Sequence, residues 1–63
     1  MIKANDKTLQ QQLAEIMEAP CNDIANINSA DRTFEIGKFV YCFTFTKSGS
    51  ITKQSVKFNS IKK

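Results

Sequence analysis

The stretch Phe39-Val40-Tyr41-Cys42-Phe43-Thr44-Phe45-Thr46 decides the fold, because an aromatic residue alternates with a smaller one four times in succession. A period of two is typical of a β-strand with one buried face. The cluster Lys47-Ser48-Gly49-Ser50 that follows is typical of a turn, and residues 51–58 are again compatible with a strand. The sequence therefore predicts a β-hairpin over residues 39–58.

The polarity of the two strands predicts their register. If Ser48-Gly49 is a two-residue loop, the aromatic face carries the pairs Phe39 with Phe58, Tyr41 with Val56, Phe43 with Gln54 and Phe45 with Thr52. The opposite face then carries Lys53 and Lys57 among small residues. A loop of odd length would place the aromatic residues beside these lysines, so the even loop separates polar from apolar side chains better.

A second turn precedes this hairpin. Gly37-Lys38 has glycine first, as a type II′ turn requires, and it places Ile36 opposite Phe39 and Phe34 opposite Tyr41. Both apolar residues fall on the aromatic face. The sequence therefore predicts a three-stranded antiparallel meander over residues 32–36, 39–46 and 51–58.

An amphipathic helix is predicted near the start of the chain, over residues 8–18. Its apolar stripe consists of Leu9, Leu13, Ile16 and Met17. Thr8 and Gln11 have the spacing of a capping box, with Asp6 as the alternative cap. Pro20 disfavours the helical conformation of the residue before it, so the helix should end there.

These elements predict an α+β domain of one helix packed on a three-stranded meander, with residues 1–63 as a single unit. Residues 21–31 are expected to form a connection that places Ile24, Ile27 or both in the core. Residues 59–63 are expected to form a frayed basic tail.

Composition argues against several classes of function. The 63 residues include no histidine, which removes the usual nucleophile and general-base arrangements, and a chain this short has little wall to enclose a substrate. With two cysteines and no signal peptide, we expect free thiols, a cytoplasmic location and neither a metal nor another cofactor. A non-enzymatic protein is predicted. An enzyme centred on Cys42, or on Glu15 and Glu18, is the remaining alternative.

Charge divides the chain into two halves. Residues 1–36 carry three basic and six acidic side chains, whereas residues 37–63 carry six lysines and no acid. The candidate binding residues are these lysines: Lys38, Lys47, Lys53, Lys57, Lys62 and Lys63. Lysines on a floor of small residues suit a surface that follows phosphates, although lysine is also the ordinary way to solvate a sheet face. Nucleic acid is the expected partner, ahead of an acidic protein.

The aromatic face is expected to form the hydrophobic core, because the helix needs an apolar surface to cover, and the part left uncovered indicates a second binding surface. Eleven helical residues span about 16 Å, whereas eight strand residues span about 26 Å, so some aromatic side chains should protrude beyond the helix. Exposed apolar patches usually mark interaction sites. Tyr41, Phe43 and Phe45 are the candidate protein-interface residues. They suit a homodimer, or a small phage-type inhibitor or adaptor that blocks a host enzyme.

The hairpin from Phe39 to Phe58, followed by a lysine tail, resembles the C-terminal dimerising ribbon of small phage repressors of the Cro type. The resemblance covers only this part of the chain. The helix-turn-helix of those proteins is missing, so the resemblance does not imply operator binding.

Overall fold

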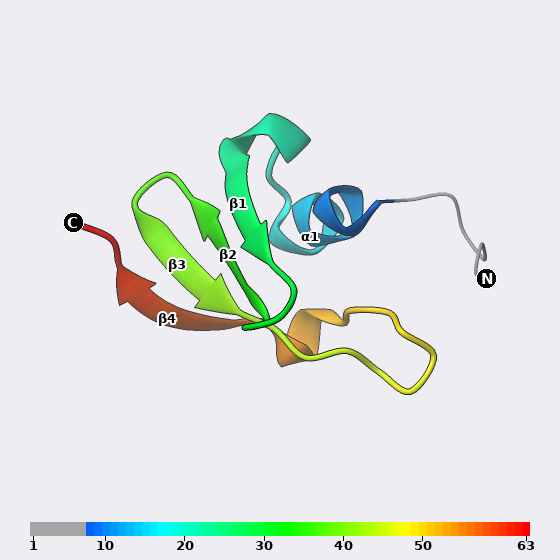
Figure 1. Cartoon of the computed structure of the whole chain (residues 1–63). Helices are drawn as coiled ribbons and strands as arrows, with labels where there is room; N and C mark the ends of the chain where they lie inside the picture. The colour runs from blue at the N-terminus through cyan, green and yellow to red at the C-terminus, as the bar shows by residue number, and fades with distance from the viewer. Residues whose placement is uncertain (1–7) are drawn as a thin grey trace.

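The computed structural model describes residues 8–63 and shows in them one α-helix beside a four-stranded antiparallel sheet of order β1-β2-β3-β4 (Figure 1). The elements are α1 (Leu9–Met17), β1 (Ile24–Asn28), β2 (Thr33–Ile36), β3 (Phe39–Cys42) and β4 (Lys57–Ile61), with short 3-10 helices at Cys21–Asp23 and Lys53–Ser55. The predicted α+β class is confirmed. The predicted count of three strands is wrong, because the sheet has four.

The helix begins with the predicted capping box. The backbone N–H of Gln11 donates to the Thr8 hydroxyl, and the Thr8 backbone N–H donates to the Gln11 side-chain oxygen, both at 3.2 Å. Two of the backbone donors left over at a helix start are thereby satisfied. Asp6, the alternative cap, lies outside the described residues.

The helix ends before Pro20, as predicted, with Glu18 in the left-handed conformation at φ 59°. The N–H of Ala19 donates to the carbonyl of Ala14 at 2.9 Å and that of Glu18 to the carbonyl of Glu15 at 3.3 Å, which are the two bonds of a Schellman ending. Glycine is the usual residue at such a position because it has no Cβ to clash. Glu18 therefore occupies a conformation that strains its backbone.

The segment predicted as a connection, residues 21–31, contains β1, and this is the main correction to the predicted fold. Ile24 pairs with Ile36 and Ile27 pairs with Phe34, so both isoleucines lie on the core face although they are three residues apart. A β-bulge at Ala25 makes this possible, because one extra residue turns a spacing of three into the same-face spacing of a strand.

The hairpin of β2 and β3 forms in the predicted register. Phe34 lies opposite Tyr41 and Ile36 lies opposite Phe39. Gly37 has a φ of 60°, the positive value expected at the first position of the turn.

The predicted register of the second hairpin is wrong. Strand β3 ends at Cys42, and β4 pairs Tyr41 with Phe58 and Phe39 with Ile61 around a bulge at Asn59. Between them Phe45 forms an isolated bridge with Ile51, and the polar run Lys53–Ser55 folds into a 3-10 helix. This short helix removes Lys53 from the sheet face. The Phe45–Ile51 bridge has the odd loop length that the polarity pattern disfavoured, and the 3-10 helix takes Lys53 out of the strand where it would otherwise lie beside Phe43.

The core lies between α1, the first three strands and the loop that precedes β4. Its buried side chains are Leu13, Ala14, Ile24, Phe34, Phe43 and Ile51. Phe34 has no exposed surface and stacks on Tyr41 with ring centroids 5.3 Å apart. Helix α1 packs beside β1, at the opposite side of the sheet from β4 (Figure 1). The β3–β4 side is therefore left without a helix over it.

Gln10 joins the helix to the chain that leads into β1. Its side-chain amide donates to the carbonyl of Cys21 at 2.8 Å and to that of Ile24 at 2.9 Å. At the other end of the chain, the segment expected to fray contributes its first three residues to β4, and the N–H of Lys62 donates to the Lys38 carbonyl at 2.6 Å.

Candidate binding surface

Three large apolar side chains are exposed at the β3–β4 side of the sheet. Phe39 is 46% exposed, Phe58 57% and Ile61 58%. Phe39 and Ile61 are cross-strand partners, and Phe58 pairs with Tyr41 on the same face. We call this set of Phe39, Phe58 and Ile61 the open corner. It confirms the expectation that part of the aromatic face extends beyond the helix.

The rings of the open corner are held by other rings. Phe39 and Phe58 have centroids 6.3 Å apart and planes tilted by 60°. Phe58 also meets Tyr41 edge to face at 6.0 Å, and Tyr41 stacks on buried Phe34. A continuous aromatic row therefore connects the core to the surface. Both exposed rings are oriented by this packing before any ligand arrives.

Of the predicted interface residues Tyr41, Phe43 and Phe45, only Tyr41 borders the open corner. Phe43 is only 2% exposed and belongs to the core, whereas Tyr41 and Phe45 are half-buried. Phe45 packs edge to face on Phe43, and the Arg32 guanidinium lies 5.9 Å from the Phe45 ring centroid. The exposed aromatic residues are Phe39 and Phe58. The observed register of β4 is what identifies Phe39 and Phe58 as the exposed pair, and the sequence did not predict this register.

The six candidate lysines do not form one surface. Lys38 precedes β3, Lys57 begins β4, and Lys62 and Lys63 follow β4, so four lysines border the open corner along the chain. Lys47 lies in the loop at the opposite end of the domain from the C-terminus (Figure 1). The sequence predicts Lys53 on a strand. It lies instead in the 3-10 helix.

Lys57 and Lys62 lie on the other face of the sheet from the open corner. Lys57 pairs with Cys42, whose neighbour Tyr41 points to the core, so strand alternation places Lys57 on the outer face. Lys62 also reaches this face, where its ammonium lies 3.1 Å from the Glu35 carboxylate. Strand β4 is at the edge of the sheet. Only its free edge therefore separates the apolar residues on one face from Lys57 and Lys62 on the other.

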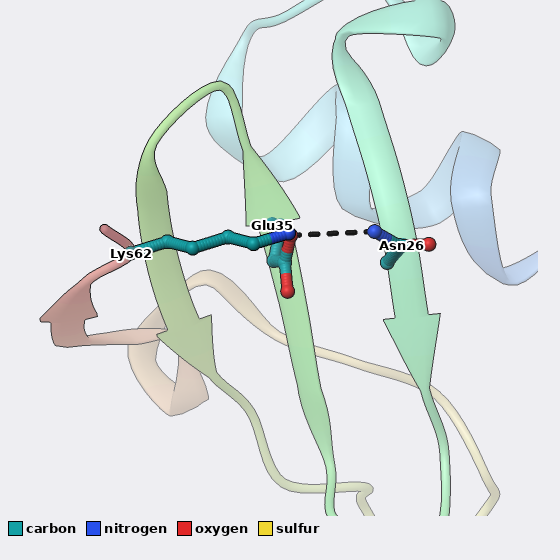
Figure 2. A network of polar contacts seen from close by, with 3 residues as sticks. All are labelled: Asn26, Glu35 and Lys62. Carbon is teal, nitrogen blue, oxygen red and sulfur yellow. Dashed lines mark hydrogen bonds and ion pairs between the residues drawn. The ribbon is translucent and has the colours of Figure 1, made fainter.

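A polar network on the outer face crosses three strands. Figure 2 shows Lys62 approaching Glu35 from one side and Asn26 approaching it from the other. Glu35 Oε1 accepts from Lys62 Nζ at 3.1 Å and from Asn26 Nδ2 at 3.3 Å. The hydrogen bond from Lys62 first, and that from Asn26 second, hold the pKa of the Glu35 carboxyl below its ordinary value. Glu35 is therefore paired with Lys62 and offsets the positive charge of this lysine.

The remaining candidates for chemistry are dispersed. Cys21 and Cys42 are free thiols on different elements. Glu15 and Glu18 line an open groove of about 630 Å³ between the end of α1 and Cys21. Within residues 8–63, no group of three or more cysteine, aspartate or glutamate side chains is placed to hold a metal ion. No helix in the same range is long and apolar enough to cross a membrane.

Comparisons of the chain with protein-family models, with curated proteins and with solved structures find no match.

Proposed function

We propose that this protein is a small non-enzymatic binding module whose basic β-hairpin surface binds nucleic acid at the open corner. The observation that carries the proposal is that exposed Phe39, Phe58 and Ile61 belong to a stretch, residues 37–63, with six lysines and no acid. Apolar side chains beside exposed cations suit a surface that contacts bases and phosphates together.

The type of cation supports nucleic acid as the partner. Lysine is depleted in contact surfaces between proteins, where aromatic residues and arginine are enriched. In the half of the chain that forms the open corner, every basic residue is a lysine. Lysine neutralises a phosphate as a point charge, without the fixed fork of arginine, so we expect binding with little sequence preference.

The pairing of Lys62 with Glu35 narrows the set of lysines available to a ligand. Lys62 is engaged on the outer face by Glu35, whereas Lys38, Lys57 and Lys63 are exposed, with Lys57 across the free edge of β4 from the open corner. These three are proposed as the principal phosphate contacts. Lys47 and Lys53, which lie elsewhere on the domain, are not.

Salt-dependent binding tests this proposal. We would measure the affinity for labelled mixed-sequence oligonucleotides, single-stranded and duplex, by fluorescence anisotropy at several salt concentrations. Each phosphate neutralised should contribute about −0.7 to the log-log slope on a single strand and about −0.9 on a duplex. The variant Lys38→Gln/Lys57→Gln should bind more weakly and with a shallower slope.

The matched control is Lys47→Gln/Lys53→Gln, which removes the same charge from other parts of the surface. If both double variants weaken binding equally, net charge alone attracts the ligand and the open corner is not the site. Absence of binding, or binding that does not respond to salt, contradicts the proposal outright.

An acidic protein is the second candidate partner, favoured by one observation. Ile61 is 58% exposed, and an aliphatic side chain contributes to a protein contact without needing a base to stack on. In this case the module acts as an inhibitor or adaptor. Capture of the same partner from a native lysate with and without nuclease separates the two candidates, because only a protein partner survives the nuclease.

Self-association through the open corner is less well supported. In a symmetric dimer the same patch meets itself, so the lysines next to it in the chain would be brought near those of the second copy. Like charges placed close together oppose association. The homodimer expected from the sequence therefore stays a prediction, to be checked by sedimentation.

A further inference from the structure

We infer that the open corner prefers single-stranded to duplex nucleic acid, because Phe39 and Phe58 are placed to stack on unpaired bases. This inference rests on the proposed function and specifies its ligand. Its basis is the arrangement of two exposed rings on one face of the sheet, Phe39 on β3 and Phe58 on the edge strand β4, with lysines across the free edge of β4.

The two rings form a platform in which they pack on one another at a tilt of 60°. Phe39 and Phe58 are each about half exposed, and their centroids are 6.3 Å apart. Tyr41 supports Phe58 from the core side at 6.0 Å. A platform that is ordered in advance loses little side-chain entropy on binding, and every base has a face that can stack on it.

A duplex cannot use this platform. Its bases are already stacked on one another, and its outer surface is a hydrated phosphate backbone. Placing Phe58 and Ile61 against that backbone would leave apolar surface beside charge with no compensating contact. A single strand can turn its bases toward the rings, as it does on the exposed sheet aromatics of RNA-recognition modules.

The lysines indicate where the backbone of such a strand would run. Lys57 lies at the start of β4, and Lys38 lies beside its end, where its carbonyl accepts from Lys62. Five strand residues span about 16 Å, which is room for about two or three stacked bases. The phosphates would then follow the free edge of β4, between cations at both ends.

The size of the open corner agrees less well with a protein partner. A specific protein interface buries about 800 Å² on each side and places large aromatic or arginine residues at its centre. Here each of the three apolar side chains has a lysine next to it in the chain, before Phe39 and Phe58 and after Ile61. The patch fits a narrow ligand that carries its own negative charge along one side.

The test compares ligands of matched length and sequence. We would measure the affinity of the full chain for a single strand, for the same sequence in a duplex, and for a single strand of the same length made of abasic nucleotides. The intact single strand should bind about tenfold or more tightly than the other two, since stacking of even one base contributes about fivefold or more.

The variants separate ring stacking from simple apolar contact. Phe58→Leu keeps an apolar side chain but loses the aromatic face, so it should weaken single-strand binding about fivefold or more and leave duplex binding unchanged. Phe58→Tyr should retain the affinity. Because Phe58 is 57% exposed, both variants are expected to fold, which circular dichroism would verify.

The outcomes distinguish this inference from the proposed function. Base stacking is overturned if duplex, abasic and intact single strands bind equally well and Phe58→Leu has no effect. The wider proposal still holds in that case if binding depends on salt. No binding to any of the three ligands overturns both. Displacement of the single strand by an acidic, leucine-containing peptide at lower concentration would show that the corner is a protein-binding surface and overturns both as well.

Discussion

Lys62 extends across β3 and places its ammonium 3.1 Å from a carboxylate oxygen of Glu35 in β2. The two residues are 27 positions apart in the sequence. The ion pair therefore ties the end of the chain to the centre of the sheet. Its influence on stability can be measured through pH.

Acidification should weaken this tie. The Glu35 pKa is lowered chiefly by the hydrogen bond from Lys62, so the folded state favours the carboxylate. The stabilisation is present at neutral pH, above the unfolded-state pKa of about 4.3, and is lost as the pH falls through the lower folded-state pKa. An NMR titration of the Glu35 carboxyl should show a pKa that Lys62→Met raises. Lys63→Met removes the same charge without the contact and should leave it nearly unchanged.

Replacement of Phe34 should destabilise the domain severely. Phe34 is fully buried and contacts the rings of Tyr41 and Phe43. Phe34→Ala should cost about 3–5 kcal/mol, which is comparable with the whole stability of a domain this small. Phe34→Leu, measured by urea unfolding, should cost about 1–3 kcal/mol, and Phe39→Leu at the open corner less than about 0.5 kcal/mol. Equal losses for the two leucine variants would contradict the assignment of the core.

Gln10→Glu should separate the helix from the start of β1. The Gln10 amide donates to the carbonyls of Cys21 and Ile24, and a carboxylate in its place has no proton to give. Two part-buried carbonyls would then face an acceptor, at an expected cost of about 1–3 kcal/mol in the free energy of unfolding. Gln12→Glu makes the same chemical change two positions along α1, at a side chain that does not bind these two carbonyls. An equally large loss there would indicate a general effect of charge on α1.

Glu18→Gly should stabilise the protein. Glu18 has a φ of 59° at the end of α1, and glycine adopts this conformation without a steric penalty. We expect a gain of up to about 1 kcal/mol in the free energy of unfolding, reduced by the extra freedom of glycine in the unfolded chain. Glu18→Ala is the control, because it removes the carboxylate and keeps the Cβ. A gain with alanine as large as that with glycine would mean that charge, and not backbone strain, is responsible.

The parts of the fold that depend on short-range signals could be predicted from the sequence. The Thr8 and Gln11 capping box and the Gly37 turn are each specified within four residues, and both form as predicted. In these places the side chains that define the element are also those that satisfy its backbone.

Strand β1 could not be predicted because its bulge hides the period of two. Ile24 and Ile27 are spaced as on a helix, and the asparagine residues around them favour turns. Only pairing with β2 shows that Ala25 is the extra residue. The information that identifies residues 24–28 as a strand therefore lies in the pairing with β2 and not in the sequence of the segment.

The length of the helix predicted that an apolar patch would be exposed, but it did not predict which residues form the patch. They depend on where the chain rejoins the sheet after residue 46, and the 3-10 helix at Lys53–Ser55 moves Phe58 from opposite Phe39 to opposite Tyr41. Phe43 consequently lies in the core and Phe58 at the surface.

Both outer strands of the sheet are bulged, β1 at Ala25 and β4 at Asn59. An unbroken outer strand offers an evenly spaced row of donors and acceptors on which a second chain can continue the sheet, and such growth leads to fibrils. Each bulge interrupts that spacing, so an incoming strand cannot stay in step along the full edge. A domain that exposes Phe39, Phe58 and Ile61 would otherwise be prone to aggregate. The two irregular edges therefore oppose edge-to-edge pairing while the apolar corner stays exposed.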